Sequence, residues 1–153
     1  MKLYFLRHGD ADWPKWNKPD DERPLTKRGK KEMKQVGRFL RDQKPKISLI
    51  LSSPLPRALQ TAEIAAEHLD VKLKEEPALA KGFNAQRLRQ ILKGRKAANV
   101  MLVGHEPDFS EVIAELTSGR VKLPKAGIAL VDLSENASKG VLVWLIPPKI
   151  ATG

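Results

Sequence analysis

Two histidines in this chain follow short apolar runs that break off beside a glycine. The first run, "KLYFL", leads into Arg7, His8 and Gly9, and the second, "NVMLVGH", ends in Gly104 and His105. Each run is typical of a buried strand, which delivers the next side chains to the edge of a sheet. A neutral imidazole there can attack phosphorus if its other ring nitrogen is held protonated by an acceptor. We therefore expect His8 to act as a nucleophile.

Three arginines occur near these runs or in segments that can reach them. Arg7 precedes His8, Arg23 lies in "RPLT", and Arg57 lies in "SSPLPRALQTA". The planar guanidinium group matches two phosphate oxygens at once. Such cations would repel one another without a dianion among them, because no carboxylate is expected between them. We predict that Arg7, Arg23, Arg57 and His105 bind phosphate, with His105 as a protonated donor.

This residue set predicts phosphoryl transfer without a metal or any other cofactor. The arginines would neutralise the equatorial oxygens of a loose transition state, a task that magnesium performs in other enzymes. The chain has no cysteine and only three histidines, so a zinc enzyme is not expected. The third, His68, lies near the predicted end of a helix, where the helix dipole explains its presence.

Composition and charge limit the class of protein. The 153 residues are 41% hydrophobic and 30% charged, which is typical of one globular domain, expected over residues 1–153. No apolar run approaches the roughly 20 residues of a membrane-spanning helix, and the N-terminus does not resemble a signal peptide. We expect a cytoplasmic protein without membrane contact. The net charge of +10 favours acidic partners, but no nucleic-acid-binding motif accompanies it, so nucleic acid is not expected.

Apolar periodicity predicts strands and helices in alternation. Predicted strands span residues 2–6, 47–53, 71–77 (a short edge strand), 99–105, 128–133 and 141–146. Helices are expected after Thr26, after a cap at Ser53 with Pro54 in the first turn, over "NAQRLRQILKG", and around Phe109 to Leu116. The last residues are expected to fray. The fold class is α/β, a three-layer α/β/α sandwich whose mainly parallel sheet ends in an antiparallel C-terminal hairpin.

Four blocks of sequence carry a resemblance to a known family. "LRHGDA", "RPLTKRG", "SSPLPRALQTA" and "VGHEPDFS" occur in this order, and the resemblance that they carry covers nearly the whole chain. They resemble the histidine phosphatase superfamily, also called phosphoglycerate mutase-like, and are most similar to its SixA-like branch, the phosphohistidine phosphatases. The resemblance implies that His8 becomes transiently phosphorylated and that Arg7, Arg23, Arg57 and His105 form the phosphate pocket.

The chain departs from the broader family in one respect. Larger members carry an acidic residue in mid-chain that protonates an alcohol leaving group, whereas "PALAKGFNAQ" contains no acid. Asp10 is a candidate acid or orienting residue; Asp12, Glu75 and Glu76 are the other nearby carboxylates. The imidazole of phosphohistidine leaves more readily than an alkoxide and needs little help from an acid. We therefore predict a metal-independent phosphatase that removes phosphate from phosphohistidine in a signalling (phosphotransfer) protein.

Two alternatives remain open from the sequence. The first is a phosphomonoesterase of the same fold that acts on small molecules, with Asp10 or another carboxylate as the acid. The second is a docking module that binds phosphate without turnover. The role of Trp13 and Trp16 is also open, because they could line a substrate cleft or anchor their loop on the core. The basic run from Lys27 to Lys34 could be a solvated helix face or could bind an acidic partner.

Overall fold

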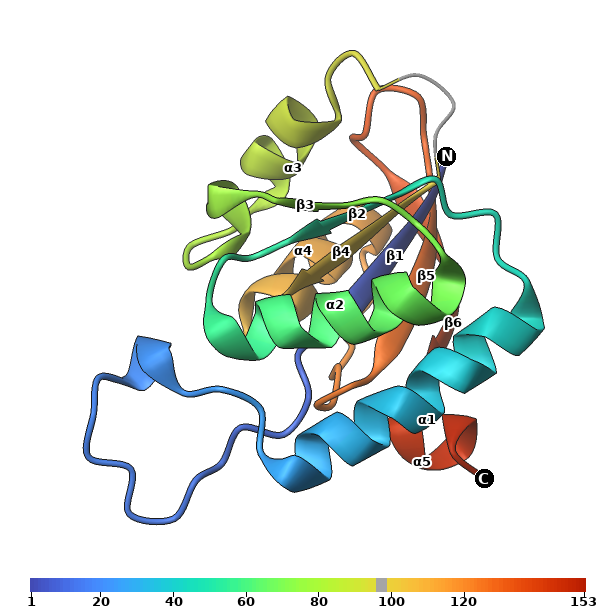
Figure 1. Ribbon diagram of the computed structural model, residues 1–153. Helices are drawn as coiled ribbons and strands as arrows, with labels where there is room; N and C mark the ends of the chain where they lie inside the picture. Colours follow the sequence, from blue (N-terminus) through green and yellow to red (C-terminus); the bar gives the residue numbers. More distant parts are fainter. Residues whose placement is uncertain (96–98) are drawn as a thin grey trace.

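A computed structural model describes residues 1–95 and 99–153 of the chain. These residues form one six-stranded sheet with helices on both faces (Figure 1). The strands are β1 (Lys2–Arg7), β2 (Leu49–Ser52), β3 (Leu73–Glu75), β4 (Val100–Gly104), β5 (Ile128–Leu133) and β6 (Gly140–Ile146). The helices are α1 (Lys27–Gln43), α2 (Pro56–Leu69), α3 (Ala85–Leu92), α4 (Asp108–Thr117) and α5 (Pro148–Ala151), with short 3-10 helices η1 (Asp20–Glu22) and η2 (Pro77–Leu79).

The strand order places the two histidine-bearing strands side by side. The order is β3-β2-β4-β1-β5-β6, and the first four strands are parallel. β5 pairs antiparallel with both β1 and β6, which confirms the predicted hairpin at the sheet edge. Arg7 of β1 lies opposite Gly104 of β4 in the register. His8 and His105, the next residue on each strand, therefore emerge together at the same edge of the sheet.

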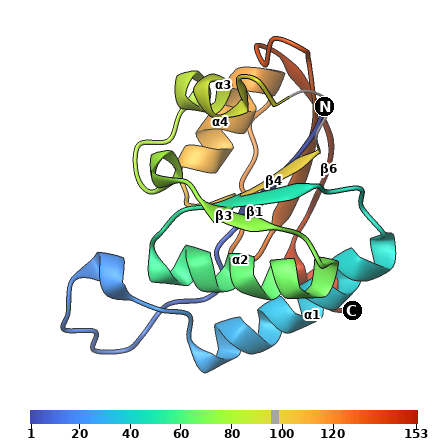
Figure 2. The ribbon, with the colours of Figure 1, turned by 45° about the horizontal axis from the view of Figure 1, so that its top comes forward.

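Alternate side chains of the central strands enter two separate cores. Leu3 and Phe5 point to the face covered by α3 and α4, whereas Tyr4 and Leu6 point to the face covered by α1 and α2. All four side chains are buried, as expected for a strand covered on both faces. Figure 2 shows the two helical layers on either side of the sheet. The predicted three-layer α/β/α sandwich is confirmed.

Two predictions about helix ends were wrong. The N-cap of α2 is Leu55 and its first residue is Pro56, so neither Ser53 nor Pro54 has the predicted place. Ser53 remains in the loop, where its Oγ accepts from the amide of Leu55 at 3.2 Å. At the C-terminus, the predicted frayed residues instead contain α5, and Ala151 is half-buried against the core. This contact supplies the apolar burial that holds so short a helix.

The start of α1 is tied to the residues that follow β1. Thr26 caps the helix by accepting from the amide of Gly29 at 3.0 Å, and its hydroxyl donates to Asp10 Oδ2 at 2.6 Å. A Cβ at Gly29 would overlap the Asp10 carbonyl oxygen, so only glycine permits this close approach. The block "RPLTKRG" thus fixes the chain that carries His8 against the first turn of α1.

His68 has a structural position away from the other two histidines. Its Nδ1 lies 2.8 Å from the Ile64 carbonyl oxygen within α2, and its ring fills the space beside Gly37 of α1. A side chain at Gly37 would collide with this ring, so the pair sets the close packing of the two helices. In the described parts of the chain, no helix has the length and hydropathy needed to cross a membrane.

Candidate active site

A cavity of about 400 Å³ lies where β1 and β4 end. The five side chains predicted to bind or attack phosphate all line it: Arg7, His8, Arg23, Arg57 and His105. Its other lining residues are Asp12, Asp20, Lys81, Gly82, Glu106, Pro107, Asp108 and Lys125. The parallel strands and the following helix α2 therefore bring three distant blocks of sequence to one place, as expected for the carboxyl edge of such a sheet.

The ring of His8 is held in one tautomer by its own backbone. Its Nδ1 lies 2.7 Å from the Gly9 carbonyl oxygen. Since a carbonyl oxygen only accepts hydrogen bonds, Nδ1 must carry the proton, and Nε2 of the neutral ring keeps its lone pair. Burial, with smaller effects of Arg57, Arg7 and Arg23, lowers the pKa of His8 to about 4. His8 is therefore neutral at pH 7, the state that a nucleophile requires.

The ring of His105 lies beside that of His8, with 5.4 Å between ring centroids. Its Nε2 is 2.8 Å from Ser53 Oγ, a hydroxyl that can donate as well as accept. Burial, followed by the nearby His8, lowers the pKa of His105 to about 3. These surroundings therefore favour the neutral form of His105, and not the protonated donor that the sequence predicted. A dianion beside the ring would stabilise the protonated form and raise its pKa.

Three buried nitrogens at this cavity have no hydrogen-bond partner among the described residues. They are Nε of Arg7, Nε of Arg57 and Nδ1 of His105. Buried polar groups in proteins are nearly always paired, so unmatched donors in one cavity indicate a ligand with acceptor oxygens. All three belong to the residues predicted to bind phosphate. The nitrogens without a partner therefore lie on residues that the sequence predicts to bind an oxyanion.

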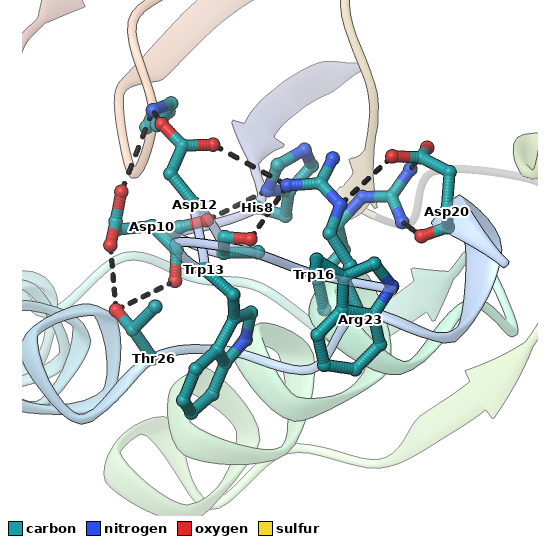
Figure 3. A network of polar contacts seen from close by, with 12 residues as sticks. His8, Asp10, Asp12, Trp13, Trp16, Asp20, Arg23 and Thr26 are labelled. Carbon is teal, nitrogen blue, oxygen red and sulfur yellow. Dashed lines mark hydrogen bonds and ion pairs between the residues drawn. The ribbon is translucent and has the colours of Figure 1, made fainter. Parts of the chain in front are cut away.

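The prediction that no carboxylate lies between these cations was wrong. Asp20 in η1 accepts from Arg23 Nε at 2.9 Å, and its Oδ2 lies 3.7 Å from Nη2 of Arg57 (Figure 3). Asp12 lies 3.4 Å from Nη1 of Arg23 and pairs with Lys125. These contacts were missed because they depend on how the loop between β1 and α1 folds back, which has no periodic signal in the sequence. They offset much of the expected repulsion.

Asp10 lies outside the cavity lining. Its side chain accepts from the Thr26 hydroxyl, and Nζ of Lys125 lies 3.5 Å from its other oxygen (Figure 3). Of its two predicted roles, these contacts favour orientation of the chain over proton donation, because the carboxylate is bonded to the helix cap. Glu75 and Glu76 also lie away from the cavity, at the end of β3 and the start of η2.

Several residues of the site were not assigned a functional role from the sequence. Lys81 and Lys125 line the cavity from separate segments of the chain and pair with Asp21 and Asp12, respectively. Thr61 donates to the Arg57 carbonyl oxygen at 2.7 Å and accepts from the amide of Gly9 at 3.0 Å. The sequence signal for Thr61 was its place in the "RALQTA" block, one helical turn after Arg57.

The fold and the cavity together define a class of protein. The chain matches the histidine phosphatase superfamily (branch 1) over residues 3–82, and it belongs to this superfamily of hydrolases. Within the superfamily it is SixA-like. It is 31% identical over 156 residues to phosphohistidine phosphatase SixA of Escherichia coli (strain K12), across 97% of this chain and 94% of the relative.

Two further comparisons agree with this placement. An uncharacterized protein of Picosynechococcus sp. is 35% identical over 150 residues, across 91% of this chain and 88% of the relative. The solved structure of the protein histidine phosphatase SixA complexed with tungstate superimposes with a TM-score of 0.86 at 29% identity, covering 98% of this chain and 99% of that one. The similarity thus extends over the whole fold, including every segment that lines the cavity.

Proposed function

We propose that this protein hydrolyses phosphohistidine on a protein substrate, through a covalent phosphohistidine on His8 and without a metal ion. The observation that carries the proposal is the set of three buried nitrogens without a partner, the donors Arg7 Nε and Arg57 Nε together with Nδ1 of His105, on residues that line the same cavity as His8. A phosphoryl group supplies acceptor oxygens for such donors. The SixA structure in complex with tungstate, an oxyanion, supports the same ligand chemistry.

The first step transfers the phosphoryl group to His8. Nε2 of His8 attacks phosphorus while the bond from phosphorus to the substrate imidazole breaks. The substrate ring enters with its other nitrogen protonated, so it leaves as neutral imidazole. Nδ1 of His8 remains protonated against the Gly9 carbonyl, which stabilises the positive charge that develops on the ring. Arg7 and Arg57 neutralise the charge on the transferring oxygens, the task that a metal ion performs in other phosphoryl-transfer enzymes.

The second step returns His8 to its neutral state. A water molecule attacks phosphorus, the bond to Nε2 breaks, and both protons of the water remain with the phosphate, which is released as dihydrogen phosphate. Since the leaving group is again an imidazole with its other nitrogen protonated, neither step needs a strong acid. In the described parts of the chain, no three histidine or carboxylate side chains are grouped as metal ligands.

The ion pairs and hydrogen bonds of the carboxylates in the cavity support phosphohistidine, rather than an ordinary phosphate ester, as the substrate. Asp12 is paired with Lys125 and Arg23, and the hydrogen bond from Lys125 holds its pKa below the usual range. Both oxygens of Glu106 accept from Ser110, at 2.8 Å and 2.5 Å. Because its pKa is lowered, Asp12 is a poor proton donor at neutral pH. The lining therefore suits a leaving group that departs without protonation.

Phosphate release from a phosphorylated histidine-containing phosphotransfer domain tests the proposal. The wild-type protein should release phosphate from the domain, and His8→Ala should not. His68→Gln is the matched control, because this histidine lies in α2 away from the cavity and its replacement should leave the rate unchanged. Activity on sugar phosphates, with none on the phosphorylated domain, would reject the substrate assignment.

A further inference from the structure

Two tryptophans project from the loop between β1 and α1, at residues 12–23, here called the tryptophan loop. Trp13 and Trp16 flank a turn in which Pro14 is followed by Lys15 with a φ of 57°. Proline at the second position of a turn and a left-handed residue at the third are typical of a type II turn, which brings the first and fourth side chains together. The two ring centroids lie 6.2 Å apart.

These rings do not anchor the loop on the core. Neither Trp13 nor Trp16 belongs to the two hydrophobic clusters that the described residues form; Trp13 is 39% exposed and Trp16 is half-buried. Each indole N–H donates to a carbonyl oxygen, that of Pro24 at 2.8 Å for Trp13 and that of Pro19 at 3.1 Å for Trp16. The polar atom of each ring is thus satisfied within the segment, and the apolar ring surface is held in place outside the core.

The tryptophan loop is attached directly to the cavity. Arg23 donates to the Ala11 carbonyl oxygen at 2.6 Å and to Asp20 at 2.9 Å, and Arg57 Nη1 donates to the Asp20 carbonyl oxygen at 3.1 Å. Figure 3 shows Trp13 and Trp16 beside this network, next to Arg23 and Asp20. A phosphoryl group in the cavity would therefore bring the rest of a bound macromolecule next to the paired rings.

The unpaired charges of the tryptophan loop are mainly positive, because Lys15 and Lys18 outnumber Glu22, which is also exposed and forms no ion pair with a described residue. The carboxylates of Asp12, Asp20 and Asp21 are paired with cations of the cavity wall. Lys15 and Lys18, on the same loop as the rings, are exposed and form no ion pair with any described residue. The basic run continues this pattern, because Lys27, Lys30 and Lys31 are exposed in the first turns of α1.

We propose that Trp13 and Trp16, with Lys15 and Lys18, form a docking surface for the protein that carries the phosphohistidine. This inference rests on the proposed function. The occupant is a protein surface with apolar side chains next to the phosphorylated histidine and carboxylates around them. Such a surface would match paired rigid aromatic rings beside unpaired cations. Tryptophan is enriched among the few residues that dominate the binding energy of protein interfaces. A small phosphoester would reach the cavity without touching the rings.

The double variant Trp13→Ala with Trp16→Ala tests the docking surface, with two substrates measured side by side. For a phosphorylated histidine-containing phosphotransfer domain, KM should rise about tenfold or more, because the lost contacts belong to the protein part of the substrate. For free phosphohistidine, kcat/KM should stay within about twofold of the wild-type value, since the rings do not line the cavity. Val141→Ala with Val143→Ala is the control, an exposed apolar pair on β6.

The outcomes separate the docking surface from the proposed function. Equal loss on both substrates would mean that the rings support the cavity, and unchanged KM for the domain would mean that they contact no partner; either result overturns the inference. Phosphate release from the domain by the wild-type protein tests the proposed function on its own. Lys15→Glu with Lys18→Glu should also raise KM for the domain, by an amount that shrinks as salt is added. A salt-independent KM would contradict the charge part of the surface.

Discussion

β1 and β4 are neighbouring parallel strands that both end in histidine, but their imidazoles are held by different partners. His8 Nδ1 is bound to a backbone carbonyl, which can only accept and therefore fixes the tautomer. His105 Nε2 is bound to the Ser53 hydroxyl, which can donate or accept and therefore allows the ring to gain or lose a proton. The residue after β1 thus has a ring held in one tautomer and the residue after β4 has a ring that can change its protonation, which supports the proposed roles of nucleophile for His8 and donor for His105.

Removing each histidine should have unequal effects, and this is the largest difference that the comparison predicts. His8→Ala should lower turnover by about 10⁴-fold or more, because the group that forms the covalent bond is lost. His105→Ala should lower kcat by about 10²–10³-fold, as expected for one donor to the transferring oxygens. Single-turnover phosphate release measures both rates. Equal losses for the two variants would contradict the division of roles.

Arg57→Ala should weaken inhibition by vanadate by about 10²-fold. Its guanidinium lines the cavity with an unmatched Nε, so the variant loses a charged donor to the oxyanion. Inhibition constants measured with a small phosphoester give the change. Arg87→Ala is the matched control, because this arginine is exposed in α3 outside the cavity lining. Unchanged inhibition in Arg57→Ala would place this residue outside the oxyanion site.

Ser53→Ala should have a smaller effect, about tenfold on kcat/KM. The hydroxyl is fully buried, and its loss leaves His105 Nε2 and the Leu55 amide without their partner. Since the nucleophile is untouched, labelling of His8 by a phosphoryl donor should remain. Rates and labelling are measured on the same preparation. If Ser53→Ala lost labelling as completely as His8→Ala, the proposed division of roles between His8 and His105 would be wrong.

The pH dependence of the free energy of unfolding should reflect the lowered pKa values of both His8 and His105. The folded-state pKa values of about 4 and about 3 lie below the value of 6.5 for an unperturbed histidine. Between pH 6.5 and 4 the unfolded chain therefore takes up protons that the folded chain does not, and the free energy of unfolding falls as the pH falls. Each histidine contributes a slope of up to about 1.4 kcal/mol per pH unit. Urea titrations should show a shallower slope in His105→Ala, and an unchanged slope would contradict the low pKa of His105.

The strands and the convergence of the histidines could be predicted because they follow from local pattern. The runs at residues 3–6 and 100–103 are apolar throughout, which requires cover on both faces, and parallel strands place their carboxyl ends at one edge. The family blocks added Arg23, which lies in a segment without periodicity. The cavity lining confirms that these segments meet, while the catalytic roles of their side chains remain a prediction.

The carboxylates and the role of Ser53 could not be predicted, because they depend on contacts between segments far apart in sequence. Asp20 reaches Arg57 only because the tryptophan loop folds back onto α2, and Lys125 reaches Asp12 across nearly the whole chain. Ser53 matched the pattern of a helix cap, but the two prolines after it delay the helix to Pro56 and leave the hydroxyl for His105. Loop conformation, rather than residue type, decided these cases.

Trapping the phosphorylated enzyme tests the central claim most directly. The wild-type protein is incubated with a phosphoryl donor, quenched in alkali to preserve the phosphorus–nitrogen bond, and mapped by mass spectrometry. The account predicts one labelled histidine, at His8, which is absent from His8→Ala and retained in Ser53→Ala. A phosphoryl group on His105 instead, or turnover with no labelled histidine in a rapid quench, would contradict it.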